Sequence, residues 1–211
     1  MDMKKYVLFF SILFMVTSCR SQTEESVSNS KLGGPCEGCE AIYEYGNEVL
    51  DPVDTLPAFA ANEPKLKLSG TVYQADGKTP APNVILYIYH TNRDGIYETK
   101  GDEQGWARRH GYIRGWIRTD ASGKYSFYTF RPASYPNGRE PQHIHITVKE
   151  PGRKEYYLDD FLFTDDPYLT SELKGNRSNR GGSGITTPRA AGALFLIERD
   201  IILGKNIPHY E

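Results

Sequence analysis

From Lys65 onward the sequence is a series of short runs rich in Val, Ile, Tyr, Phe and Thr, separated by clusters of Gly, Pro, Asp and Asn. β-Branched and aromatic residues fit the pleated surface of a strand, and the residues between the runs supply turns. Because no long stretch has the apolar period of a helix, the pattern predicts an all-β fold, an antiparallel β-sandwich. The predicted strands are Leu66–Tyr73, Val84–His90, Tyr112–Arg118, Lys124–Phe130, His143–Lys149, Tyr156–Phe163 and Leu194–Leu203.

Two connections between the predicted strands are long, residues 93–111 and residues 174–193. Long irregular loops in a compact domain tend to carry functional sites, so we expect the site there. A short helical turn is expected within residues 165–173. The domain organisation that we predict is a signal peptide at 1–18, a lipid-anchored flexible tether at 19–35, an N-terminal extension at 36–63 and the sandwich domain at 64–211.

Residues 1–18 have the three-part layout of a signal peptide, with a lysine pair, an apolar run too short to span a bilayer, and two small residues. Val16-Thr17-Ser18-Cys19 resembles the bacterial lipobox, in which the cysteine is lipidated and becomes the mature N-terminus. Arg20 in place of an aspartate resembles the lipoproteins sorted to the outer membrane. We therefore expect an exported lipoprotein anchored through Cys19, the alternative being ordinary signal cleavage that leaves Cys19 unmodified.

The remaining cysteines, Cys36 and Cys39, form a C-x-x-C pair. In an oxidising compartment an even pair favours a local disulfide over a zinc half-site, because the other zinc ligands are missing. We interpret the pair as structural.

The charge of the chain excludes some classes of partner. Lysine and arginine number 25 against 27 acidic residues, so no long-range field favours nucleic acid or an anionic membrane surface. Tyrosine is abundant, with 15 residues, and tyrosine both fits strands and carries an oxygen that can bind a metal. The function is therefore expected from a local site.

The segment Gln142-His143-Ile144-His145-Ile146-Thr147-Val148 alternates strictly between polar and aliphatic residues. Because strand side chains point to opposite faces with a period of two, the two histidines and Thr147 share one face and the aliphatic residues face the core. Imidazoles two residues apart on a strand have Cα atoms about 6.5 to 7 Å apart, which lets both reach one metal ion. The alternative is two exposed strand histidines, because histidine is also an ordinary half-buried residue.

Three short motifs follow one another around these histidines: Gly123-Lys124-Tyr125-Ser126-Phe127, then Tyr135-Pro136, then Pro141-Gln142-His143-Ile144-His145. Their order resembles the pattern G-x-Y-x-F, Y-P, P-x-H-I-H of the intradiol ring-cleavage dioxygenases. Upstream, Ile88–Tyr97 is similar without a gap to the stretch in which a strand of these enzymes runs into a loop that delivers a tyrosine ligand. The likeness covers about residues 64–204 and implies a prealbumin-like sandwich whose long loops carry a metal site.

The resemblance implies a non-haem Fe(3+) centre held by Tyr97, Tyr135, His143 and His145. A trivalent ion at bonding distance strongly favours the ionised phenol, so two phenolates suit the ferric state. In the family a catechol displaces the second tyrosine, here Tyr135, which accepts a proton, and O2 then attacks the ring to give a muconate-type diacid. The implied partners are therefore a small catechol-type substrate and O2.

Three departures from the family pattern bear on the substrate. The interval from Tyr135 to His143 is shorter than in the catechol- and protocatechuate-cleaving enzymes, which predicts a more open pocket. Those enzymes place an arginine three residues before the first ligand histidine, where this chain has Glu140, with Arg139 one step away. Because a one-residue shift on a strand reverses the face, Arg139 can act as the catalytic arginine only if the preceding loop is not extended. Tyr87 stands where many relatives have an acidic residue.

Two other interpretations stay open at the level of the sequence. A non-catalytic cell-surface binding module is the alternative function, because Leu68–Tyr89 with its turn at Gly77 also resembles prealbumin-like sandwich domains without a metal. Zinc or copper could bind the same imidazoles, although paired phenolates are unusual for either ion.

Overall fold

The computed structural model describes residues 31–211. The predicted signal peptide, the lipidation site Cys19 and the tether up to residue 30 lie outside the described residues, so they stay predictions. Within residues 31–211, no helix combines the length and the apolar character that a bilayer-spanning helix requires.

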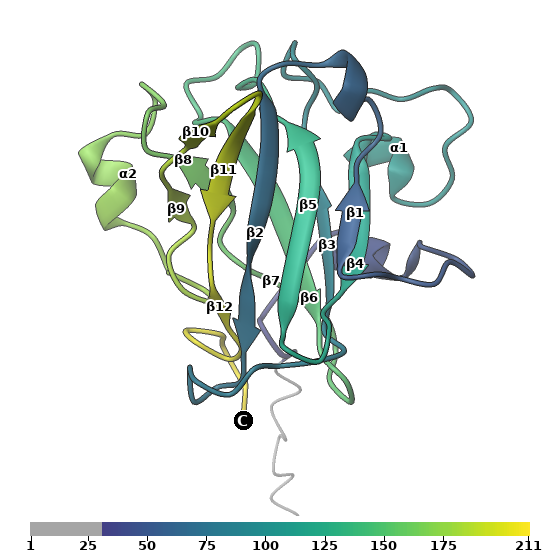
Figure 1. Ribbon diagram of the computed structural model, residues 1–211, viewed down its shortest axis with the longest axis vertical. Helices are drawn as coiled ribbons and strands as arrows, with labels where there is room; N and C mark the ends of the chain where they lie inside the picture. Colours follow the sequence, from purple (N-terminus) through teal and green to yellow (C-terminus); the bar gives the residue numbers. More distant parts are fainter. Residues whose placement is uncertain (1–30) are drawn as a thin grey trace, which may run out of the picture.

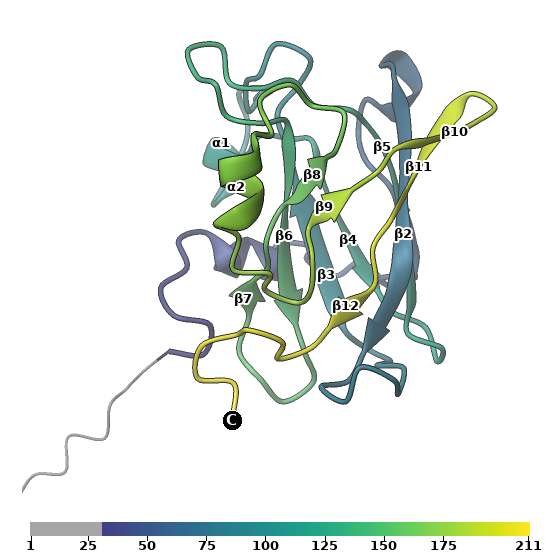
Figure 2. The ribbon, with the colours of Figure 1, turned by 90° about the vertical axis from the view of Figure 1, so that its left-hand side faces the viewer.

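Two β-sheets face each other and enclose the main core (Figures 1 and 2). The first sheet contains β1 (Val53–Thr55), β5 (Lys124–Phe130), β2 (Lys65–Tyr73), β11 (Leu194–Glu198) and β10 (Arg189–Ala191) in that order, with β12 (Ile201–Ile202) also paired to β2. The second sheet contains β4 (Arg114–Arg118), β3 (Ile85–Tyr89), β6 (His143–Lys149), β8 (Phe161–Phe163) and β9 (Ile185–Thr186), with β7 (Tyr156–Tyr157) also paired to β6. Four short helical segments complete the described chain: η1 (Cys39–Tyr43), η2 (Phe59–Ala61), α1 (Ala107–His110) and α2 (Ser171–Gly175).

The predicted all-β sandwich is confirmed, and its sheets are mixed rather than purely antiparallel. The central pairs β2–β5, β3–β4 and β3–β6 are antiparallel, as expected. The pairs β1–β5, β11–β2, β12–β2 and β8–β9 are parallel. Parallel neighbours are joined by long connections rather than tight turns, so short-range turn signals do not reveal them.

The core between the sheets follows from the alternation of each strand. Leu66 and Leu68 of β2 and Phe127 of β5 point inward from the first sheet, and Leu86 and Ile88 of β3 point inward from the second. On β6 the inward residues are Ile144, Ile146 and Val148, as the alternation predicts. Burying these apolar side chains is the main favourable contribution to folding, at about 25 cal/mol per Å² removed from water.

The predicted bounds differ by one or two residues for β2, β3 and β4, and they fail where a strand is interrupted. β5 and β6 have the predicted bounds. The predicted strand Tyr156–Phe163 is split into β7 and β8 by residues 158–160, and Leu194–Leu203 is split into β11 and β12. The expected helical turn is α2, which begins at Ser171, and β9 and β10 lie within the second predicted loop.

A second apolar cluster lies on the outer face of the second sheet. Ala41 and Ile42 of η1 are fully buried against Ile85 and Tyr87 of β3. Figure 2 shows this part of the chain, coloured purple, together with α1 and α2 on the side of the second sheet. The segment 36–63, expected as an extension, thus contributes η1 to this cover and β1 to the first sheet. The structure places Cys36 and Cys39 in a disulfide at the start of η1.

Candidate metal centre

Strand β6 presents His143 and His145 on its outer face. His145 is paired across the antiparallel ladder with Tyr89 of β3, and His143 is paired with Leu162 of β8. His143 is buried and His145 is partly buried. Since β6 has neighbours on both sides, its backbone fixes the spacing of the two imidazoles.

Tyr97 is delivered by a tight loop after β3. The side-chain oxygen of Asn92 accepts hydrogen bonds from the backbone N–H groups of Asp94 (2.9 Å) and Ile96 (3.1 Å). Asn92 N–H donates in turn to the carbonyl of Ile96 at 2.8 Å. These local bonds are typical of asparagine in turns, and they aim the next residue, Tyr97, back over the sheet.

The loop that carries Tyr135 is held against the Tyr97 loop. Thr91 Oγ1 donates to the carbonyl of Ala133 at 2.8 Å. Gly95 has a φ of +76°, and a Cβ atom built there would lie 2.0 Å from the carbonyl oxygen of Ser134. Only glycine fits at position 95, because any other residue would be strained at this φ and its Cβ atom would clash with the backbone of the second loop.

The four side chains predicted as ligands meet at one point. Tyr97 Oη lies 2.6 Å from Tyr135 Oη and 2.7 Å from His145 Nε2. Tyr135 Oη lies 3.2 Å from His143 Nε2. Residues up to 48 positions apart in the chain therefore bring two phenol oxygens and two imidazole nitrogens into one continuous series of contacts, His143–Tyr135–Tyr97–His145.

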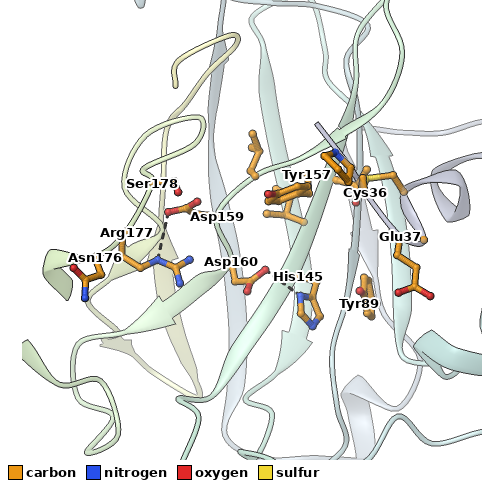
Figure 3. A pocket seen from close by; sticks show the side chains of 16 residues that line it. Cys36, Glu37, Tyr89, His145, Tyr157, Asp159, Asp160, Asn176, Arg177 and Ser178 are labelled. Carbon is orange, nitrogen blue, oxygen red and sulfur yellow. Dashed lines mark hydrogen bonds and ion pairs between the residues drawn. A yellow bond between two sulfur atoms is a disulfide. The ribbon is translucent and has the colours of Figure 1, made fainter. Parts of the chain in front are cut away.

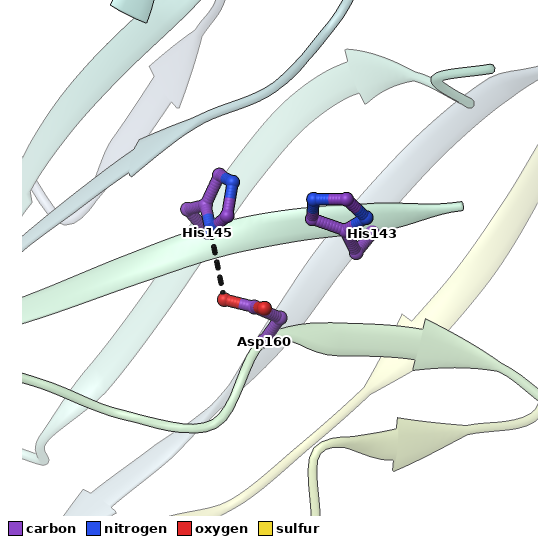
Figure 4. Close-up of side chains that lie close together, drawn as sticks. All are labelled: His143, His145 and Asp160. Atoms are coloured by element: carbon purple, nitrogen blue, oxygen red, sulfur yellow. Dashed lines mark hydrogen bonds and ion pairs between the residues drawn. The ribbon is translucent and has the colours of Figure 1, made fainter. Parts of the chain in front are cut away.

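The far nitrogen of each imidazole is also engaged. His143 Nδ1 lies 2.7 Å from the carbonyl oxygen of Pro141. His145 Nδ1 lies 3.0 Å from Asp160 Oδ1, as Figure 4 shows by the dashed line. Such a partner on the far nitrogen orients a histidine and directs its other nitrogen toward a metal. Both Nε2 atoms accordingly face the phenols.

Asp160 is the functional residue that the sequence reasoning missed. One oxygen or nitrogen from each of His143, His145 and Asp160 lies within 4.8 Å of the others, a grouping that could itself hold a metal ion. Since Asp160 contacts Nδ1 of His145, on the side away from the phenols, we place it behind the ligand rather than among the four donors. Buried Arg199 donates to the carbonyl of Asp159 at 2.6 Å and so holds the segment that carries Asp160. The sequence signal for Asp160 is the pair Asp159-Asp160, which interrupts an apolar run that is predicted as one strand.

The electrostatics of the centre favour neutral phenols and a neutral His143 in the absence of a cation. Burial raises the pKa of Tyr97, and its hydrogen bond with Tyr135 raises it further. Burial also raises the pKa of Tyr135, whereas burial and the neighbouring His145 lower the pKa of His143. Burial opposes ionisation of Asp160, but the charge and hydrogen bond of His145 outweigh it and hold the pKa of Asp160 below its usual value. The phenols can ionise here only if a strong positive charge is bound between them.

The donor set fits one small, highly charged cation. Ligand atoms roughly 2.0–2.1 Å from a common ion lie roughly 3 Å from one another, by simple geometry. The contacts among the four side chains, 2.6–3.2 Å, are close to this separation, so only small outward movements are needed. Hard phenolate oxygens combined with imidazoles suit Fe(III).

A family model described as "Dioxygenase" matches residues 55–181, which is more than half of the chain and contains all four of these side chains and Asp160. The chain belongs to the intradiol ring-cleavage dioxygenase family. Among curated relatives, it is 30% identical over 137 residues to the protocatechuate 3,4-dioxygenase beta chain of Burkholderia cepacia, covering 59% of this chain and 58% of the relative. It is 31% identical over 148 residues to catechol 1,2-dioxygenase 2 of Acinetobacter lwoffii, covering 63% and 52%. The chain thus spans about half the length of the curated relatives it matches.

Solved structures of similar fold include other dioxygenases. The dioxygenase domain of a fusion with a carbohydrate-binding protein from Streptomyces sp. SirexAA-E has a TM-score of 0.54 and 21% identity, covering 76% of this chain and 95% of that one. Catechol 1,2-dioxygenase from Acinetobacter sp. ADP1 has a TM-score of 0.55 and 22% identity, covering 73% and 57%. At identities of 21% and 22%, these similarities show that this intradiol dioxygenase family member shares its fold with both structures.

Two hollows flank the histidines of this intradiol dioxygenase family member. One, of about 440 Å³, lies beside His145 and is lined by the disulfide loop on one side and by Asp160 and Arg177 on the other (Figure 3). A smaller hollow of about 200 Å³ lies beside His143 and also borders Asp160 and Arg177. Arg139 lines this smaller hollow from an exposed loop. The structure thus brings Arg139 near His143, and its catalytic role stays a prediction.

Proposed function

We propose that the protein is a non-haem Fe(III)-dependent intradiol dioxygenase that cleaves catechol-type rings with O2. In this reaction the carbon–carbon bond between the two hydroxyl-bearing carbons breaks, and both oxygen atoms of O2 enter the muconate-type diacid. The observation that carries the proposal is the meeting of Tyr97, Tyr135, His143 and His145 at donor-to-donor distances of 2.6–3.2 Å. Family membership supports the same reaction class.

The four side chains would hold the ion, and bound Fe(III) would supply the activation of a catechol-type ring toward O2. Tyr97 is held on its loop by Asn92, so it serves as the fixed phenol. Tyr135 precedes five exposed residues, 136–140. Within the described residues, its side chain forms hydrogen bonds only at Oη, with Tyr97 and His143. It is therefore the phenol with room to swing away and to take up a substrate hydroxyl proton at Oη.

The surrounding residues keep the site aligned and place positive charge beside it. Asp160 holds the imidazole of His145 through Nδ1, and the carbonyl of Pro141 does the same for His143. Arg177, on the border of both hollows, lies with Nε 3.3 Å from Asp159 Oδ2. Together with Arg139 it offers positive charge near the place where negative charge develops on the substrate ring.

The test is iron content, colour and oxygen uptake of the purified protein. We expect about one iron per chain and a wine-red colour from tyrosinate-to-iron charge transfer, with O2 uptake on at least one of catechol, hydroxyquinol and protocatechuate. Tyr97→Phe and His145→Ala should each weaken or shift the colour, because at least one tyrosinate remains in either variant, and each should lower the turnover by at least about 10³-fold, because it removes a donor that acts as part of one unit. Surface Lys67→Ala, on the opposite sheet, is the matched control. A colourless iron-loaded protein, a native protein that holds zinc or copper, or uptake that persists in Tyr97→Phe would reject the proposal.

We also propose that the protein is exported and held at the outer membrane by a lipid on Cys19. The signal-like residues 1–18 support this, and so does the disulfide between Cys36 and Cys39, because disulfides persist in oxidising compartments. Labelling of bacteria with radioactive palmitate should mark the parent chain and not Cys19→Ala. Equal labelling of the two chains would contradict the anchor.

A further inference from the structure

The imidazole of His145 makes two hydrogen bonds in its plane, and one of its faces packs against a ring. Asp160 engages Nδ1 at 3.0 Å and Tyr97 engages Nε2 at 2.7 Å, and these two contacts leave the ring free to tilt about the line that joins them. Tyr89, directly opposite on β3, stacks on the imidazole with 4.5 Å between ring centroids and 25° between planes. The tilt of the ligand ring is therefore limited by Tyr89.

Tyr89 is itself enclosed on its other face by His110. The centroids of these two rings lie 3.8 Å apart and their planes differ by 6°. His110 ends the short helix α1, is buried, and has its Nδ1 2.9 Å from the hydroxyl oxygen of Tyr87. Trp106, just before α1, stacks on the outer side of His110 at 5.5 Å. A continuous ring stack thus runs Trp106–His110–Tyr89–His145 from the cover of the second sheet to the metal centre.

The loop closed by the disulfide covers the edge of this stack. Gly38 lies between Cys36 and Cys39, has a φ of +84°, and a Cβ atom there would lie 2.6 Å from His110 Nε2. Cys39 is 1% exposed, and its Sγ lies 4.0 Å from Thr147 Oγ1, two residues along β6 from His145. The loop is therefore fixed between the stack and the strand that carries both histidine ligands.

Tyr87 and the disulfide loop, which lies before the residues 55–181 matched by the family model, meet at this point. Tyr87, where many relatives have an acidic residue, holds His110, and the C-x-x-C loop covers His110 through Gly38. Neither feature touches the donor atoms, and both contact the same ring. Both features therefore hold His110, and through His110 they fix the position of the ring stack.

We propose that Tyr89 is a positioning residue of the metal centre, and that the disulfide loop 36–39 clamps the stack that holds it against His145. The proposal rests on the iron centre of the proposed function and deepens it. Hydrogen bonds to the far nitrogen of a ligand histidine are the usual way to orient it, and here a stacked ring adds a restraint on the tilt of the imidazole that hydrogen bonds in its plane lack. The clamp acts on the angle of His145 rather than on the presence of any donor.

The experiment compares full-length variants by Fe(III) affinity in chelator competition and by the rhombicity of the ferric electron paramagnetic resonance signal. Tyr89→Leu removes the ring and should weaken Fe(III) binding by about 10- to 100-fold and change the rhombicity. Tyr89→Phe keeps the ring and should stay within about twofold of the parent, since only the hydroxyl is lost. Tyr128→Leu, a half-buried tyrosine of β5 in the other sheet, is the matched control and should leave both readouts unchanged.

The disulfide arm uses Cys36→Ser combined with Cys39→Ser, which frees the loop without touching a ring. We expect a change of rhombicity in the same direction as for Tyr89→Leu and a smaller loss of affinity, about threefold, because the stack remains but loses its cover. If Tyr89→Leu does not fold, this double variant decides the question.

The outcomes separate the two proposals. A parent protein that takes up no Fe(III) or lacks the charge-transfer colour overturns the proposed function and this inference with it. A parent with both properties, together with a folded Tyr89→Leu or disulfide-free variant that keeps the parental affinity and rhombicity, overturns the clamp alone.

Discussion

The two outer faces of the sandwich have the same pleated backbone but different neighbours. On the first sheet, the outward residues of β2 begin with Lys65, Lys67 and Ser69, which are partly exposed. On the second sheet, Tyr87 is fully buried under η1 and α1, and Tyr89 is enclosed between two imidazoles. The inter-sheet core needs only one apolar face per sheet, whereas the candidate centre forms where the second face is covered as well.

The cover changes the physical setting of polar side chains. Away from water, phenols and imidazoles stay neutral and hydrogen-bond one another, and a cation that enters is screened less than at a surface. The first sheet lacks such a cover over Lys65 and Lys67, so its outer face stays in contact with water and contributes solubility. We therefore expect changes in the first sheet to alter stability and changes on the covered face to alter metal binding.

The largest effect that would sharpen this contrast is expected for Gly123→Ala, just before β5. Gly123 has a φ of +70°, and a Cβ atom there would lie 2.4 Å from the carbonyl oxygen of Val72 in β2, so the backbone must move. We expect the free energy of unfolding to fall by about 3 kcal/mol, as for severe overpacking, while the folded fraction keeps its Fe(III) affinity. Urea unfolding measures the free energy of unfolding, and chelator competition measures the affinity. Ser69→Ala, in the neighbouring strand β2, is the control, and a stable Gly123→Ala variant that no longer binds iron would contradict the contrast.

A second effect concerns His90, which bridges the two sheets just after β3. Its Nε2 lies 2.6 Å from Thr129 Oγ1 of β5, and burial lowers its pKa from 6.5 to about 4. A histidine that is neutral in the folded state stabilises above its unfolded pKa, and this stability is lost as the pH falls from 6.5 toward 4. Between pH 6.5 and 4.5 the loss should be roughly 2 kcal/mol from this residue.

The measurement is urea unfolding of the parent and of His90→Gln across this pH range. The glutamine can keep a hydrogen bond and cannot gain charge, so its stability should vary less with pH than that of the parent. Parallel curves for the two proteins would show that His90 does not carry the acid sensitivity.

On the covered face, Asp160→Asn should weaken Fe(III) binding by about tenfold, equivalent to about 1.4 kcal/mol, because an amide orients the far nitrogen of His145 less strongly than a carboxylate. The unfolding free energy should change little. Asp159→Asn is the matched control, since its carboxylate contacts Arg177 and the backbone of Asn179 rather than His145. Equal losses of affinity in both variants would mean that the effect is general charge and not orientation.

The smallest effect is expected at the edge of the first sheet. Arg189 of β10 pairs with Glu198 of β11 at 2.7 Å, and both side chains are largely exposed. Exposed pairs contribute little, so Arg189→Ala should change the unfolding free energy by less than about 0.5 kcal/mol and leave iron binding unchanged. A loss of iron binding in this variant would show that changes in the first sheet also alter the metal centre.

The regular half of the site could be predicted from the sequence, and the reason lies in strand periodicity. The alternation in β6 places His143 and His145 together and Ile144 and Ile146 in the core, and the structure agrees. The two tyrosines followed only from the family resemblance, because nothing local links position 97 to position 135. Strand periodicity therefore predicts only that His143 and His145 lie on the same face of β6.

Other features depend on contacts that a local pattern does not encode. Tyr156–Phe163 looks like one strand because its apolar residues are nearly continuous, and the break that turns Asp160 toward His145 comes from Arg199, which holds the carbonyl of Asp159. Tyr87 contacts His110 of α1, 23 positions further along the chain, and the periodicity of β3 gives no sign of this pairing. The parallel pairing of β1 with β5 likewise joins distant segments.

The close contact between Gly95 and Ser134 couples the backbones of the two loops that carry Tyr97 and Tyr135. A backbone fluctuation that lifts the Tyr97 loop must displace the chain just before Tyr135, so the two loops move as one body, within which only the Tyr135 side chain has room to swing away. The metal-free protein should then present both phenols to an entering ion at the same time. Inserted residues in either loop are tolerable only beyond this point of contact, which confines natural or engineered length variation to the segments after Tyr97 and Tyr135.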